Sequence, residues 1–436
     1  MVTSMVLSQP IGLGGPVGFK VLTIWEKLRR FGLEYCDLPT MLSNVATLLR
    51  LMALNVDGRG TPLAFVFLTI VVSIVYFYVY VVSVAWFVLW RKTDDLVVII
   101  VNLSLGIACA ICVINVMFNL FAFEHKTNLL NIVASNRAKK ACVAYLAFDK
   151  RIDRDSRMYQ NLLKNLRIVK RRAIFVWTML VSNGLIYVLM PHLLPGKHLI
   201  EDLQVLYGLE PMFESPNFEI SHILVGTAVM SLVYAAGTIG CLLIVVTGYI
   251  EAQMTALSHE LLHLWADAQA LTFGDVQNQE KLRNQYIKQQ LEFIIQAHAA
   301  NLALLRLTED IFSNSIAIEF CLLAISLIVE LLGGLENTYL EIPFALTQVS
   351  MDCFTGQRLI DASLTFKEAV YSCKWENFDV QNMKIVLVIL QNSQTMALSA
   401  GGMAELRYTS LMTVFRAIYS AYATLRSTMH GHKPGH

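Results

Sequence analysis

Residues 126–172 read KTNLLNIVASNRAKKACVAYLAFDKRIDRDSRMYQNLLKNLRIVKRR and separate two long runs that contain no charged side chain. This stretch carries 13 of the 34 Lys and Arg residues and three Asp, whereas residues 192–221 carry one Lys and five acids. Positive charge stays on the cytoplasmic side of a membrane. The contrast predicts a polytopic membrane protein in which the basic loop and, two spans before it, the N-terminus are cytoplasmic.

Apolar length and helical periodicity predict seven membrane-spanning helices around this loop. About 20 apolar residues suffice to cross a bilayer, and the expected spans are 61–90, 96–123, 173–191, 220–250, 311–335, 339–359 and 403–428. The fourth helix is expected to continue past Glu251 to Trp265, and further helices are expected at 41–54, 158–170 and 381–394. The expected fold class is all-α, with an extracellular C-terminus.

The chain is expected to divide into seven segments along its length. These are a cytoplasmic lead with a short interfacial helix (1–60), spans one to four with a ligand-binding outer half (61–250), cytoplasmic helical extensions (251–310), spans five and six (311–360), cytoplasmic anchor helices (361–402), span seven (403–428) and an extracellular tail (429–436). Only 15% of residues are charged, against about 25% in soluble domains. The net charge of +1 gives no indication of nucleic-acid binding.

The sequence contains no signature of an enzyme, neither a phosphate-binding glycine loop nor a serine nucleophile elbow. The letters HELLH at 259–263 match a zinc pattern in which His259 and His263 share one helix face and Glu260 is the base. No third ligand is evident, and the segment continues a span. A helix–helix contact is therefore the expected role, and no metal or cofactor is expected.

Ionisable residues inside the expected spans require a partner or water, because a charge in the bilayer centre costs several kcal/mol. Glu319, Asp352 and Arg416 are such residues. They either flank an aqueous path or pair inside the bundle, for example Glu319 with Arg416.

The last span carries a stripe of small and hydroxylated residues. At about 100° per residue, its members fall within about 40° of one helical face: Thr413, Ala417, Ser420, Thr424 and Thr428. Such a stripe suits the wall of a pore, although small residues also permit tight helix packing in membranes. Arg416 lies about 80° from the stripe.

Aromatic, small and apolar residues gather in the expected outer halves of spans two, three, four and six. A cavity among these helices would be apolar with few polar groups and would suit a small neutral ligand. The candidate lining comprises Asn102, Val181, Gly184, Tyr187, Val188, Met230, Tyr234, Tyr339, Phe344 and Thr347.

The C-terminal third resembles the insect odorant receptor family. The runs GQRLI (356–360) and AVYSCKW (369–375) are similar to the exit of that family's sixth span and the loop after it. QNSQTMALSA (391–400) with Gly401-Gly402, and FRAIYSAYATLR (415–426), resemble its last cytoplasmic helix and final span. Together these motifs cover about a quarter of the chain.

The resemblance implies a subunit of an odorant-gated, non-selective cation channel. Such channels are tetramers around a central pore lined by span seven, in the plasma membrane of sensory-neuron dendrites, and the tuning subunit works with a co-receptor. The chain is similar to the tuning subunit, because residues 266–280 are much shorter than the co-receptor's insertion. Thr424 and Thr428 fall where the co-receptor has an apolar gate, so they depart from its pattern.

Three other classes of protein remain to be distinguished. A G-protein-coupled receptor requires an extracellular N-terminus, which the loop charges disfavour. A gustatory receptor-type channel carries a signature in the last span that Tyr422 and its neighbours do not match. A transporter predicts inverted repeats and paired broken helices, and the sequence shows neither.

Overall fold

The computed structural model describes residues 29–54, 56, 61–91, 98–107, 110, 122–123, 134–135, 137–270, 276–334 and 341–431. Strand structure in these ranges is confined to two short antiparallel pairs, β1 (Ala122–Phe123) with β2 (Ala134–Ser135) and β3 (Ser399–Ala400) with β4 (Ala404–Glu405). The rest of the regular structure is helical. The predicted all-α class is therefore confirmed.

The helices follow the predicted order, with one π-helical turn, η1, and one 3₁₀ turn, η2. Their bounds are α2 Leu38–Leu51, α3 Leu63–Phe77, η1 Tyr78–Val82, α4 Ser83–Leu89, α6 Arg137–Asp149, α7 Arg157–Leu193, α8 Asn217–Ala270, α9 Val276–Gly333, α11 Glu341–Tyr371, η2 Trp375–Asn377, α12 Val380–Asn392 and α13 Tyr408–Gly431. A short apolar helix also covers Val98–Ile107.

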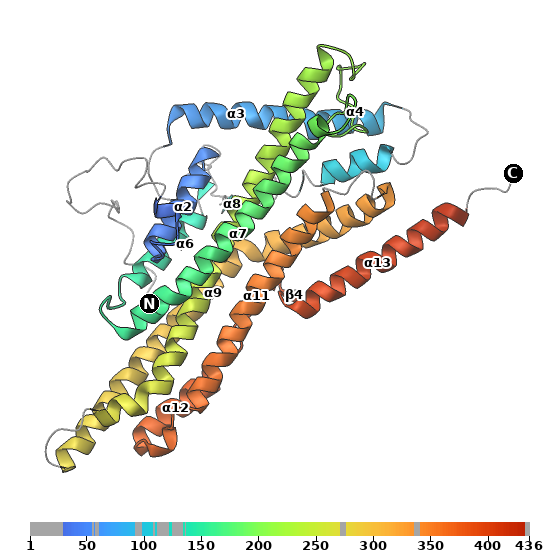
Figure 1. Cartoon of the computed structure of the whole chain (residues 1–436). Coiled ribbons are helices and arrows are strands. Elements are labelled where there is room, and N and C mark those ends of the chain that lie inside the picture. The colour runs from blue at the N-terminus through green and yellow to red at the C-terminus, as the bar shows by residue number, and fades with distance from the viewer. Residues whose placement is uncertain are drawn as a thin grey trace.

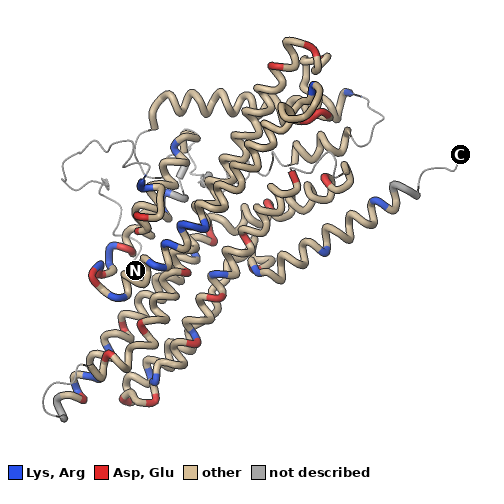
Figure 2. The backbone as a smooth tube through the Cα atoms, in the orientation of Figure 1, with Lys and Arg blue, Asp and Glu red and all other residues tan. Residues whose placement is uncertain are grey.

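Four of these helical segments are long and apolar enough to cross a membrane. They are Leu63–Leu89, Arg157–Leu193, Asn217–Ala270 and Gln279–Gly333. Helices α11 and α13 cover the predicted sixth and seventh spans but are more polar, with Arg358 and Arg416 among their residues. Figure 2 shows that the basic and acidic residues gather along the lower half of the bundle and at its upper tip, leaving a largely uncharged zone between them.

Helix α8 is the centre of the bundle, with 78% of its most apolar window buried. It contacts α7, α11, α9, α2 and α3, and Figure 1 shows α7 running beside it while α3 crosses the upper part of both. Both α8, with 54 residues, and α9, with 58, are unbroken. The predicted continuation of the fourth helix past Glu251 is thus present, and it reaches Ala270.

The N-terminal helix α2 packs against the bundle through its apolar face. Asp37 caps it by accepting from the Thr40 backbone N–H at 3.1 Å. Leu38 and Leu49 are fully buried in the main core. The chain just before α2 is held by the buried Lys170 ammonium of α7, which donates to the backbone carbonyls of three residues: Arg30, Gly32 and Tyr35.

A glycine-rich turn lies between α12 and α13. Gly401 and Gly402 have φ of 60° and 70°, the left-handed region that favours glycine, and they form the turn between β3 and β4. Because residues 399–405 form this hairpin, α13 begins at Tyr408, five residues after the predicted start of span seven. From there α13 diverges from the rest of the bundle (Figure 1).

Candidate functional site

A narrow cavity lies among α7, α8, α9 and α11, at the end of the bundle opposite α12. We call it the Tyr187 cavity, and its volume is about 70 Å³. Its walls include three of the predicted pocket residues, Gly184, Tyr187 and Phe344; the full lining is Tyr80, Leu105, Asn183, Gly184, Tyr187, Val229, Leu232, Val233, Leu323, Ser326, Glu330, Glu341, Phe344 and Ala345. Most of this lining is aliphatic or aromatic, as expected for a site that takes a small neutral molecule.

Two carboxyl groups meet one tyrosine hydroxyl at the end of the cavity. Tyr187 Oη donates to Glu201 Oε1, and it also lies 3.2 Å from Glu341 Oε1. On the neighbouring helix, Ser326 Oγ donates to Glu330 Oε1 at 2.7 Å. A buried phenol between two carboxyl groups gives the otherwise apolar cavity a hydrogen-bonding end.

Glu201 reaches this cluster from the loop between α7 and α8. Burial raises the pKa of Glu201 to about 7, since water solvates the charged form less well there. Glu201, Glu330 and Glu341 were not among the predicted site residues. The available signal was the position of Glu330 near the end of the fifth helix and of Glu341 at the start of the sixth.

Gly184 permits the close approach of α7 and α8 beside this cavity. A Cβ atom at Gly184 would lie 3.0 Å from Val233 Cγ2 and 3.1 Å from Cγ1, tighter than nearly all real contacts. A larger side chain would therefore either separate the two helices or fill the cavity.

Two other predicted pocket residues are engaged elsewhere. Asn102 Nδ2 donates to the carbonyls of Val98 and Leu203, at 2.8 and 2.9 Å, and ties a helix to the α7–α8 loop. Tyr234 Oη donates to Leu48 O at 2.9 Å and joins α8 to α2. These three hydrogen bonds give both side chains a structural role.

The remaining predicted pocket residues do not line the Tyr187 cavity. Val181, Val188 and Met230 are half-buried on α7 and α8, and Thr347 lines a second hollow. Tyr339 lies outside the described residues.

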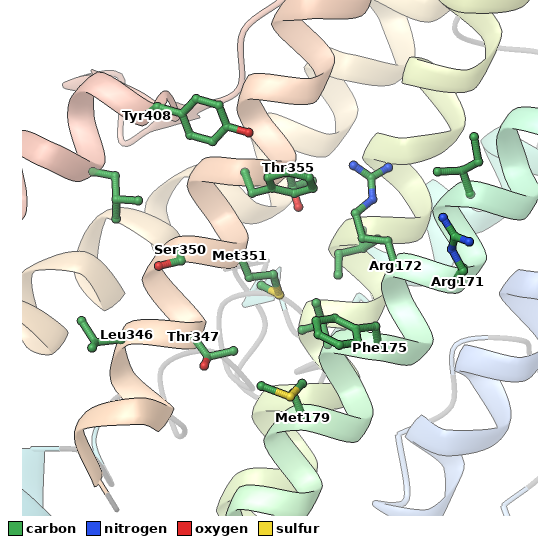
Figure 3. Close-up of a pocket in the computed structure, with 15 residues that line it drawn as sticks. Arg171, Arg172, Phe175, Met179, Leu346, Thr347, Ser350, Met351, Thr355 and Tyr408 are labelled. Atoms are coloured by element: carbon green, nitrogen blue, oxygen red, sulfur yellow. The ribbon is translucent and has the colours of Figure 1, made fainter. Parts of the chain in front are cut away.

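This second hollow is an open groove of about 770 Å³ between α7, α11 and the start of α13 (Figure 3). We call it the α7–α11 groove. Its lining is largely apolar, with two basic residues: Ile168, Arg171, Arg172, Phe175, Val176, Met179, Ile244, Leu346, Thr347, Ser350, Met351, Phe354, Thr355, Tyr408 and Leu411.

The predicted pore stripe lies on the side of α13 that faces away from the rest of the chain. Thr413, Ala417, Ser420, Thr424 and Thr428 are all exposed. On the opposite side, Ile418 is buried, and Val414 and Phe415 pack with it against α9 and α11. The chain therefore covers only part of the apolar face of α13: the hydroxylated face is open, and so are the apolar side chains of Met412, Tyr419 and Leu425.

The acidic residues inside the fifth and sixth helices lie close together. Glu319 Oε1 accepts from Gln348 Nε2 at 2.7 Å, and Asp352, one turn from Gln348, is also buried. Arg416, suggested as a partner of Glu319, is exposed on α13. Glu319 therefore has a hydrogen-bond partner on the sixth helix, the Gln348 amide.

The HELLH segment forms a helix–helix contact. Arg157 of α7 makes a bidentate pair with Glu260, at 2.6 and 3.0 Å, and also contacts Asp267 at 2.6 Å. His259 and His263 stack with ring centroids 4.2 Å apart. Glu260 thus binds α7, the role expected for this segment.

Comparisons with known proteins agree with this architecture. The family model described as 7tm Odorant receptor matches residues 95–419. The structure of the insect olfactory receptor OR5 from Machilis hrabei has a similar fold, with a TM-score of 0.66 and 11% identity over 89% of this chain and 98% of that one. The same receptor in complex with eugenol matches with the same score over 90% of this chain. No curated protein matches by sequence.

Proposed function

This chain belongs to the odorant receptor family, and from that membership we propose that it is the odorant-tuning subunit of a ligand-gated cation channel. The observation that carries the proposal is the pairing of an apolar, tyrosine-capped cavity with a helix whose hydroxylated face the chain leaves uncovered. The first feature suits a small volatile ligand, and the second suits the wall of a pore.

The ligand would bind in the Tyr187 cavity. The receptor from Machilis hrabei, of similar fold, has been solved with eugenol. At about 70 Å³ the cavity is smaller than the roughly 300–1,000 Å³ of typical ligand pockets. Ligand entry would therefore have to separate the surrounding helices, so that the ligand favours an expanded state over the narrow one. Glu341 and Phe344 lie in the first turns of α11, which would make α11 the helix that moves.

The pore would be lined by the stripe on α13. Thr413 and Thr424 each donate their hydroxyl proton to the carbonyl four residues earlier, both at 2.9 Å. With the proton engaged, each hydroxyl presents oxygen lone pairs to its surroundings. A row of such oxygens offers the weak, multiple contacts that ion conduction requires. These contacts favour cations over anions.

The proposed assembly is a heterotetramer with the odorant receptor co-receptor in the plasma membrane of a sensory dendrite. The N-terminus would be cytoplasmic, as the positive charge of residues 126–172 indicates. An epitope tag at the N-terminus should then be accessible only after permeabilisation. Accessibility on intact cells would instead support the orientation of a G-protein-coupled receptor.

The test is to record currents from cells that express this chain with and without a co-receptor while volatile compounds are applied. We expect odorant-evoked cation current when both subunits are present, with the reversal potential of an open channel. Current that requires G-protein signalling, or solute flux against a gradient, would contradict the proposal.

A further inference from the structure

The α7–α11 groove runs along helix α7, and its length can be compared with the thickness of a membrane. Along α7 it extends from Ile168 to Met179, which is about 16 Å at 1.5 Å per residue. That length is close to half of the roughly 30 Å hydrocarbon core, or one leaflet of a bilayer. The length of the groove is therefore close to the thickness of one lipid leaflet.

The two ends of the groove differ in chemistry. Phe175 and Met179 face Met351 and Thr347 across the apolar part, as Figure 3 shows. Arg171 and Arg172, the last two residues of the basic segment 126–172, lie toward the other end, and no acidic residue lines the groove. An occupant that matches this pattern is apolar along its length and negatively charged at one end.

The charged groups beside the groove carry a net positive charge, which favours an anionic occupant. Glu251 of α8 accepts from Arg172 Nη2 at 2.6 Å and from Arg358 Nε at 3.0 Å, so one carboxylate serves two guanidinium groups. Arg172 Nε and Nη1 are buried and make no hydrogen bond to the described part of the chain, so Arg172 adds positive charge behind the groove and not a donor within it. Arg171 is exposed. Arginine suits phosphate because its planar group can donate two parallel hydrogen bonds.

We propose that the α7–α11 groove binds an anionic glycerophospholipid from the leaflet on the basic side of the protein. One of its acyl chains lies between Phe175 and Met351, and Arg171 binds its anionic headgroup, with the Arg172 guanidinium adding positive charge behind it. The positive-inside rule makes this the cytoplasmic leaflet, where the anionic lipids are concentrated. Because Tyr408 and Leu411 of α13 also line the groove, the bound lipid touches the base of the proposed pore helix.

The experiment uses the full-length chain, purified and reconstituted in phosphatidylcholine vesicles. The probe is phosphatidylserine with a photoactivatable group in its acyl chain, and phosphatidylcholine with the same acyl chain is the reference. Labelled residues are mapped by peptide mass spectrometry. We expect the serine lipid to label residues 168–179 and 346–355 more strongly than the choline lipid does.

Two variants and one matched control separate specific binding from general contact with lipid. Arg171→Gln should lower labelling by phosphatidylserine about fivefold, the effect of one basic residue near an anionic surface. Arg167→Gln removes the same charge from an exposed position one turn away, outside the lining, and should label as the native protein does. Ser350→Phe should block the groove and reduce labelling by both lipids there.

Three results would overturn the proposal. Equal labelling by the two lipids would show ordinary bilayer contact, and native labelling of Arg171→Gln would exclude the headgroup site. Displacement of the probe by an odorant that activates the channel would assign the groove to odorants. The outcome is independent of channel activity, so the lipid site and the proposed function can fail separately.

Discussion

The Tyr187 hydroxyl of α7 lies 3.2 Å from the Glu341 carboxylate at the start of α11 and also donates to Glu201 of the α7–α8 loop. One side chain therefore joins two helices and a loop at the end of the cavity. Any expansion of the cavity that moves α11 away from α7 must lengthen the bond to Glu341.

Replacing Tyr187 with Phe should weaken this junction. The change keeps the ring and removes the donor, which leaves Glu201 and Glu341 without a hydrogen bond from Tyr187. A buried polar group that loses its partner costs about 1–3 kcal/mol. We expect a lower midpoint of thermal unfolding and a changed odorant response, measured by dye-based unfolding and by current recording. An unchanged midpoint together with native responses would show that the junction has no role.

The Glu201 carboxyl should make the stability of the receptor depend on pH. Because burial raises its pKa in the folded state to about 7, the folded protein holds the proton more tightly than the unfolded chain does. Stability should then be greatest at low pH and fall by about 1 kcal/mol per pH unit as pH rises from about 5 to 7. Glu201→Gln should flatten this dependence in unfolding measurements. An equally steep dependence in the variant would assign it to another group.

Adding a methyl group at Gly184 should lower odorant sensitivity. The new Cβ would press on Val233, only 3.0 Å away, and tight overpacking costs about 1–3 kcal/mol. We expect the half-maximal odorant concentration to rise about tenfold, the equivalent of about 1.4 kcal/mol. Gly237→Ala is the matched control on α8, since its Cβ would meet Trp177 at an ordinary 3.4 Å. Equal effects of the two changes would argue against a specific role for Gly184.

Thr424→Arg should reduce cation current severalfold when the chain is coexpressed with the co-receptor. A fixed positive charge on the stripe would repel cations in the narrow path. Surface biotinylation shows whether the variant reaches the membrane. Thr424→Cys and Leu425→Cys give the control: a cationic thiol reagent should block only the first, because Leu425 lies about 100° away on the helix. Native conductance in Thr424→Arg would remove this residue from the lining.

Lys170→Met should release the chain that precedes α2. The variant leaves the carbonyls of Arg30, Gly32 and Tyr35 without the ammonium that binds them, at a cost of about 1–3 kcal/mol. We expect faster proteolysis near residue 35 and a lower unfolding midpoint. Lys164→Met, at an exposed position on the same helix, should change neither.

The helical framework was predictable because helical periodicity is local. The sequence placed one cytoplasmic helix at 381–394, and α12 covers Val380–Asn392. It also extended the fourth helix beyond Glu251, and α8 reaches Ala270. The start of α13 was placed five residues too early, since the pairing of Ala400 with Ala404 in a hairpin depends on the turn conformation of the glycines between them.

The cavity was predictable only in part. Gly184, Tyr187 and Phe344 were assigned to it from residue type and depth in the bundle, and they line it. Asn102 and Tyr234 were chosen on the same grounds of residue type and depth in the bundle. Their side chains instead donate hydrogen bonds to backbone carbonyls outside the cavity. Residue type does not distinguish these two roles, because the partner of each side chain is set by tertiary packing.

The unbroken course of α9 has a mechanical consequence. Its 58 residues contain no proline and no glycine before Gly333, and at 1.5 Å per residue they extend about 87 Å, well beyond the roughly 30 Å hydrocarbon core. Such a helix has no residue that commonly forms a hinge. A tilt of α9 at Glu330, beside the Tyr187 cavity, would therefore displace the far end of the same helix.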